Sequence, residues 1–201
     1  RRIIDLVGRL AASGIKLHHI DIGGGLGITY TNETPPSPAE FIASISEVIT
    51  DKTVELLLEP GRSIVGNAGV LLTSVLYLKD TGYKNFAIVD AAMNDLIRPV
   101  LYDAWQQILA VKQDSALPEQ NYDVVGPVCE TGDFLGLDRR LAIRQGDLLA
   151  VCSVGAYGFS MSSNYNARPR AAEVLVDGGQ IHEIRRRESI EDLYRGEQIL
   201  S

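Results

Sequence analysis

The chain has 201 residues, of which 45% are hydrophobic, and a formal net charge of −7. It is long enough for one large or two smaller domains with a real core, and its negative charge argues against nucleic acid and anionic membranes as partners. No apolar run approaches the roughly 18 residues of a membrane-spanning helix. The two cysteines, Cys129 and Cys152, lack a C-x-x-C spacing and nearby histidines, so the sequence predicts neither a disulfide framework nor a zinc site and favours a reducing, cytoplasmic compartment.

Residues 1–66 alternate helix and strand. Residues 1–12 have apolar side chains at helical spacing, and Leu17–Ile22 follows as a short apolar strand. A second helix begins at Ser37-Pro38, and a second apolar strand covers Val54–Leu58. Such alternation is typical of parallel strands covered on both faces. We therefore predict that residues 1–66 are the last units of a (β/α)₈ barrel, and that a longer protein extends upstream.

Three consecutive glycines, Gly23, Gly24 and Gly25, directly follow the first strand. Exposed N–H groups in such a loop can bind an anion, most often a phosphate. The alternative is a plain tight turn between strand and helix, and we favour the phosphate site. A dinucleotide-binding G-x-G-x-x-G pattern is absent, because Ile28 occupies its sixth position.

The second strand ends at Glu59-Pro60-Gly61-Arg62, which places a carboxylate and a guanidinium at one strand exit. A surface ion pair is the simple explanation, and such pairs contribute less than about 1 kcal/mol. A glutamate beside the glycine loop is costly to bury without a cationic partner. The sequence therefore favours a functional role for this motif.

From residue 67 to residue 201 the pattern predicts a β domain, either a sandwich or an open barrel of antiparallel strands. Asp177-Gly178-Gly179 predicts a hairpin turn, Asp95–Leu109 an intervening helix and Ile190–Tyr194 a short terminal helix. The predicted strands are Val70–Leu78, Asn85–Val89, Tyr122–Val128, Asp147–Val154 and Glu173–Val176.

Three polar sets in this second part could carry chemistry. Arg98 and Tyr102 are four residues apart, so a helical turn would bring them together to bind a carboxylate, although the spacing alone favours a solvated helix face. Cys129 ends a strand beside glycine and the acids of Gly126–Asp133, where buried packing and reactivity are both open. Tyr157 follows another strand and could contact a phosphate or lie at a rim.

Five motifs in order, DIGGGLG, EPGR, VDAAMNDLIRP, GPVCETGD and GAYG, resemble the C-terminal half of the diaminopimelate decarboxylase family over nearly the whole chain. These are pyridoxal-phosphate enzymes of the alanine-racemase-like fold type, related to ornithine and arginine decarboxylases. The resemblance implies a cofactor-binding TIM barrel followed by a C-terminal β domain, and a cytoplasmic homodimer with shared active sites. It also implies decarboxylation of meso-2,6-diaminopimelate to L-lysine and CO₂, the last step of lysine biosynthesis.

The resemblance assigns roles to individual residues. Cys129 would be the catalytic proton donor, and Glu130 would recognise the distal amino group of the substrate. Both residues would be supplied by the partner subunit. The implied cofactor contacts are Gly23, Gly24, Gly25, Glu59, Gly61, Arg62 and Tyr157, and the implied substrate contacts are Arg62, Arg98, Tyr102, Glu130 and Tyr157.

The Schiff-base lysine of the family lies near the start of the barrel, and no lysine of this sequence lies in a matching motif. We therefore expect this piece alone to be inactive. Two alternatives stay open: a decarboxylase of ornithine or arginine, and a non-catalytic homologue or fragment that binds a partner. Glu130 favours the longer diacid, because ornithine-type relatives resemble this site with aspartate there.

Overall fold

The computed structural model describes residues 2–49, 51, 53–112 and 116–200. The chain divides into two compact units, Arg1–Ala68 and Gly69–Ser201. Among the described residues, no helix has the length and apolar character needed to cross a membrane.

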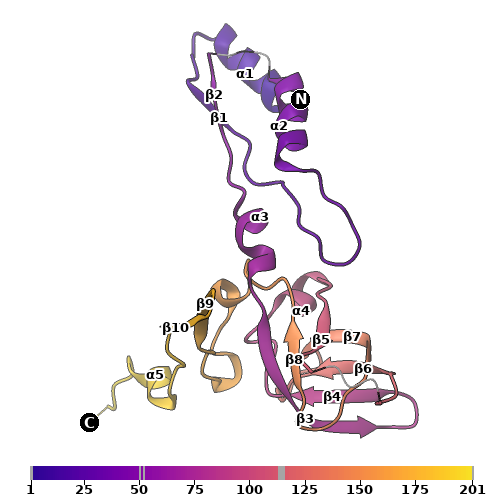
Figure 1. Cartoon of the computed structure of the whole chain (residues 1–201). Helices are drawn as coiled ribbons and strands as arrows, with labels where there is room; N and C mark the ends of the chain where they lie inside the picture. The colour runs from indigo at the N-terminus through magenta and orange to yellow at the C-terminus, as the bar shows by residue number, and fades with distance from the viewer. Residues whose placement is uncertain (1, 50, 52, 113–115, 201) are drawn as a thin grey trace. The chain divides into compact units, whose positions relative to one another are not determined.

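The first unit keeps the predicted order of helices and strands. It contains α1 (Arg2–Ala12), β1 (His19–Asp21), α2 (Pro38–Val48), β2 (Glu55–Leu57) and α3 (Gly61–Val65), followed by the 3₁₀ turn Gly66–Ala68 (Figure 1). β1 and β2 are parallel, with Ile20 opposite Leu56, as the sequence predicted. α2 begins with a capping box in which the Ser37 side chain accepts from the Glu40 N–H and Glu40 accepts from the Ser37 N–H.

The burial of these two strands differs from the prediction of strands covered on both faces. In β1 only Ile20 is buried, and in β2 Leu56 is half-buried while its neighbours are exposed. The physical reason is that two strands with short helices cannot bury both faces of a sheet. Leu26 and Ile28, in the loop after the glycines, add the other buried side chains of this unit's small core.

The second unit is built on a six-stranded mixed sheet in the order β5-β8-β3-β4-β6-β7 (Figure 1). The edge strands β5 and β7 approach each other, so the sheet nearly closes into a barrel. Its core consists of apolar side chains from neighbouring strands, including Val75, Val89, Val124, Leu135 and Leu149. The strands are β3 (Leu71–Asp80), β4 (Asn85–Val89), β5 (Ile108–Ala110), β6 (Gln120–Val125), β7 (Phe134–Leu141) and β8 (Leu148–Val151).

The prediction of purely antiparallel strands was wrong at one place, because β4 and β6 are parallel. A parallel pair needs a long crossover, and the chain between them supplies it with α4 (Arg98–Tyr102) and β5. The predicted helix over Asp95–Leu109 was correspondingly too long. Asp103 takes a left-handed conformation (φ 50°) that ends α4 after five residues.

The remaining elements lie outside the six-stranded sheet. β9 (Glu173–Asp177) and β10 (Gln180–Arg185) form the predicted hairpin, in which Gly178 has a positive φ of 55°. α5 (Ile190–Tyr194) matches the predicted terminal helix. Two 3₁₀ turns, Phe159–Met161 and Tyr165–Ala167, connect β8 with this hairpin.

Candidate functional site

In the first unit, the glycine loop packs directly against the exit of β2. The Glu59 N–H donates to the Gly23 carbonyl at 2.8 Å. A Cβ placed on Gly24 would lie 2.9 Å from the Glu59 carbonyl oxygen, so only glycine allows this approach. The loop also needs left-handed backbone at Gly23 (φ 70°) and Gly25 (φ 83°). The two motifs that the sequence placed at neighbouring strand ends therefore lie side by side.

The three glycines differ in what their N–H groups can still bind. The Gly23 N–H donates to the Asp21 Oδ1 at 2.7 Å, so it is already satisfied. Within the described residues, no hydrogen bond engages the N–H of Gly24 or Gly25. Two adjacent backbone donors can bind an anion such as a phosphate, with Gly23 shaping the turn.

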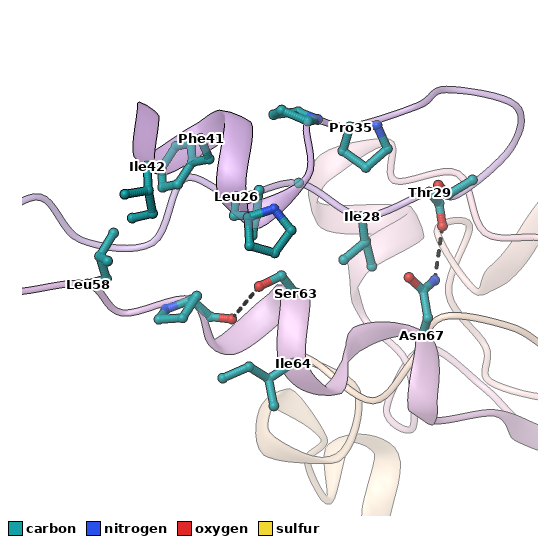
Figure 2. Close-up of a pocket in the computed structure, with 14 residues that line it drawn as sticks. Leu26, Ile28, Thr29, Pro35, Phe41, Ile42, Leu58, Ser63, Ile64 and Asn67 are labelled. Atoms are coloured by element: carbon teal, nitrogen blue, oxygen red, sulfur yellow. Dashed lines mark hydrogen bonds between the residues drawn. The ribbon is translucent and has the colours of Figure 1, made fainter. Parts of the chain in front are cut away.

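A cavity of about 510 Å³ lies next to this loop in the first unit. Figure 2 shows its apolar wall, to which Leu26, Phe41 and Ile42 contribute, and the hydrogen bond from Asn67 Nδ2 to the Thr29 carbonyl at 3.0 Å. Its lining includes none of the glycines Gly23–Gly25, nor Glu59 or Arg62. The cavity is therefore distinct from the residues to which the motifs assign chemistry.

In the second unit, Arg98 contacts two tyrosine rings. Its guanidinium carbon lies 5.6 Å from the ring centre of Tyr102, which confirms that a helical turn brings them together, and 5.1 Å from the ring centre of Tyr157. The Arg98 Nε is buried without a hydrogen-bond partner among the described residues. Tyr157 itself has a φ of 62°, a strained value for a bulky residue. A cation held by two rings with an unpaired donor is suited to binding an anion.

Cys129 and Glu130 are both exposed on the loop after β6, and a third residue joins them. The Tyr165 hydroxyl donates to Glu130 Oε2 at 3.3 Å. The charge of Glu130, together with this hydrogen bond and a smaller effect of Cys129, raises the pKa of Tyr165. Tyr165 is not among the candidates that the sequence indicated, since nothing local indicates a partner 35 positions away.

The second acid of this motif, Asp133, has a structural position. Its side chain is 4% exposed, and its two oxygens accept from the backbone N–H groups of Met93 and Val128, each at 2.7 Å. One carboxylate thereby joins the loop that precedes α4 to the loop that carries Cys129. Gly126 is required beside it, because a Cβ there would overlap the carboxylate.

Asp95, three residues before Arg98, is held in another network. Burial raises the pKa of Asp95, against the opposing effects of the Ala92 N–H and the Arg168 guanidinium. Asn94 is 2% exposed and accepts from Arg168 Nε at 2.8 Å. These side chains hold the backbone before α4.

Comparison with known proteins places these motifs in a family. A family described as pyridoxal-dependent decarboxylase, C-terminal sheet domain, matches residues 4–155. The chain belongs to this family. The matched residues include the nearly closed, mixed six-stranded sheet described above.

Several similar proteins share the name diaminopimelate decarboxylase. A Pseudomonas aeruginosa protein named diaminopimelate decarboxylase is 61% identical over 99% of this chain and 48% of its own length, and the Vibrio cholerae protein of that name is 54% identical over the same shares. The crystal structure of Helicobacter pylori diaminopimelate decarboxylase complexed with L-lysine matches with a TM-score of 0.87 and 40% identity, covering 96% of this chain and 48% of that one. The chain thus spans about half the length of the relatives it matches.

Proposed function

We propose that the full-length protein containing this chain decarboxylates meso-2,6-diaminopimelate to L-lysine and CO₂, using pyridoxal 5′-phosphate. The observation that carries the proposal is the identity of 61%, 58% and 54% to relatives named diaminopimelate decarboxylase, over 99% of the chain. Membership of a pyridoxal-dependent family supports the cofactor. A lysine/ornithine decarboxylase from Vibrio vulnificus is only 24% identical, so it supports the fold alone.

In the first unit, the glycine loop and the exit of β2 would hold the cofactor. The free N–H groups of Gly24 and Gly25 bind its phosphate, and the Glu59 carboxylate keeps a proton on its ring nitrogen. Gly61 and Arg62, which begin α3, complete the contacts that the motif assigns. When bound, pyridoxal phosphate supplies an acceptor for the electron pair that stays behind when CO₂ leaves.

The substrate contacts of the second unit follow from charge. Arg98, between the rings of Tyr102 and Tyr157, offers a fixed guanidinium to a substrate carboxylate, which leaves the other end of the diacid to react. The Glu130 carboxylate accepts hydrogen bonds from the distal ammonium group of the substrate. The Cys129 thiol donates a proton to the α carbon after CO₂ has left.

The assembly of the whole protein is part of the proposal. Residues 1–66, with two parallel strands followed by motifs at their carboxyl ends, represent the last units of a cofactor-binding TIM barrel. The rest of that barrel would supply the Schiff-base lysine. The active protein would be a cytoplasmic homodimer in which Cys129 and Glu130 complete the site of the partner subunit.

The proposal is tested by measuring CO₂ release from the full-length protein with diaminopimelate, ornithine and arginine. Diaminopimelate should be the preferred substrate. Preference for ornithine or arginine would reject the substrate assignment, and no release from any of the three would favour a non-catalytic homologue. The 201-residue piece measured alone should show no turnover, and measurable turnover would contradict the need for the remaining barrel.

Shared active sites are tested by mixing two inactive full-length variants. One carries Cys129→Ala and the other lacks the Schiff-base lysine. Mixed dimers should recover part of the activity, because each contains one site with both groups intact. Absence of recovery, with heterodimers demonstrated by mass spectrometry, would refute the sharing of Cys129 between subunits.

A further inference from the structure

Glu130 lies on an exposed loop, where a glutamate side chain ordinarily samples several rotamers. Its Oε1 accepts a long hydrogen bond of 3.4 Å from the Gly132 N–H, and its Oε2 accepts from the Tyr165 hydroxyl at 3.3 Å. A carboxylate has about four lone-pair directions, so these two bonds leave further directions open to a cation. The Tyr165 hydroxyl therefore contacts one oxygen of Glu130 and leaves other lone-pair directions open.

The segment that carries Tyr165 is itself fastened at both ends by Asn94. The Asn94 carbonyl accepts from the Ser163 N–H at 2.9 Å, and its Nδ2 donates to the Ser163 carbonyl at 3.2 Å. At the other end of the segment, Asn94 Oδ1 accepts from Arg168 Nε at 2.8 Å. Asn94 therefore anchors both ends of the segment that carries Tyr165.

The backbone between these two ends is held in an unfavourable conformation. Asn166 and Ala167 have φ values of 60° and 53°, in the left-handed region that alanine rarely occupies. Arg168 keeps the strained turn in place, since its Nη2 donates to the Asp90 carbonyl at 2.6 Å and lies 3.8 Å from Asp95 Oδ2. Strain of this kind persists where surrounding contacts over-determine a conformation, often beside a ligand site.

We propose that Tyr165 is a positioning residue that aims the Glu130 carboxylate at the distal amino group of the substrate. The inference rests on the proposed function, which gives Glu130 that ligand, and deepens it by naming the side chain that determines its orientation. The charge of Glu130 and its hydrogen bond raise the pKa of Tyr165, so the phenol stays protonated and donating at neutral pH. The carboxylate is then oriented before the substrate arrives, which lowers the entropy lost on binding.

The variant Tyr165→Phe in the full-length protein removes only the hydroxyl. The KM for diaminopimelate should rise about fivefold, the effect of one modest hydrogen bond, while kcat stays within about twofold, because the distal contact is present in the ground state and transition state alike. Tyr83→Phe is the matched control, because Tyr83 is fully exposed, and its kinetic constants should equal those of the wild type.

A second measurement does not depend on turnover. In full-length protein labelled with ¹³C at the tyrosine Cζ, Glu130→Gln should shift the Tyr165 titration to lower pH, because the charge of Glu130 raises the pKa of Tyr165. An unchanged KM in Tyr165→Phe, or an unchanged Tyr165 titration in Glu130→Gln, overturns the inference. If the wild-type protein releases no CO₂ from diaminopimelate, the proposed function fails, and the titration alone then decides whether Tyr165 orients Glu130.

Discussion

Asp133→Asn should loosen two loops at once, because one buried carboxylate accepts from the N–H groups of both Met93 and Val128. The amide keeps the shape of the side chain but replaces one acceptor oxygen with an NH₂ group. That group faces a backbone N–H, so one buried donor loses its partner. The other hydrogen bond remains but loses the charge that strengthened it.

The expected cost follows from these two changes. An unsatisfied buried donor costs about 1–3 kcal/mol, and the change from a charged to a neutral acceptor costs about 1 kcal/mol more. We therefore expect a local destabilisation of about 3 kcal/mol. If the amides exchange through local opening, this cost corresponds to exchange on the order of 100-fold faster at Met93 and Val128.

Hydrogen exchange measured by mass spectrometry on the full-length protein tests this expectation. The control is Asp80→Asn, since Asp80 also accepts a backbone N–H, that of Gly82, at 2.7 Å but is exposed to solvent. Its substitution should cost under about 0.5 kcal/mol. Equal effects of the two substitutions, or unchanged exchange at Met93 and Val128, would show that Asp133 does not join the loops.

The other predictions concern packing, pH and a helix cap. Gly24→Ala should lower the stability of the folded protein by about 1–3 kcal/mol in urea unfolding, because its Cβ would lie 2.9 Å from the Glu59 carbonyl oxygen; no change in midpoint would contradict this close approach. Hydrogen bonds from the side chain and backbone of Arg170 lower the pKa of Glu188 from 4.5 to about 2, so the stabilisation is present above pH 4.5 and lost as the pH falls toward 2. Glu188→Gln should therefore cost about 1 kcal/mol at pH 6 and almost nothing near pH 2, and a difference independent of pH would refute the linkage. Ser37→Ala should cost about 1 kcal/mol through loss of the α2 cap, with Ser37→Gly less harmful in the same unfolding assay.

The arrangement of the first unit could be predicted from sequence because its signals are local. A serine followed by proline and, three residues after the serine, by glutamate predicts a capped helix, and α2 begins there. The carboxyl ends of parallel strands meet at one edge of a sheet, so Gly23 and Glu59 were expected to lie together, and a hydrogen bond joins them. The low burial of the strands was not predictable, because burial depends on neighbours that the strand's own sequence does not specify.

The second unit shows where local patterns fail. Arg98 and Tyr102 were placed together by helical spacing, but the pattern could not show that Asp103 ends the helix or that β5 follows. Tyr157 contacts Arg98 although it lies 59 positions later in the sequence, and Tyr165 contacts Glu130 although it lies 35 positions later. Such contacts depend on how the sheet closes, which no short window of sequence records.

The same motifs contain two kinds of polar residue, which differ in whether their polar atoms already have hydrogen-bond partners. VDAAMNDLIRP contains the buried Asn94 and, four residues later, Arg98 with an unpaired Nε; GPVCETGD contains the buried Asp133 and the exposed Glu130. In each motif the buried side chain is occupied by backbone or arginine partners, and the second keeps unused hydrogen-bonding capacity. Sequence alone does not separate the two kinds, since both are polar and follow strands. The first kind holds the loops through its hydrogen bonds, so substitutions there should reduce stability and activity together. Under the proposed function, substitutions of the second kind should reduce activity alone.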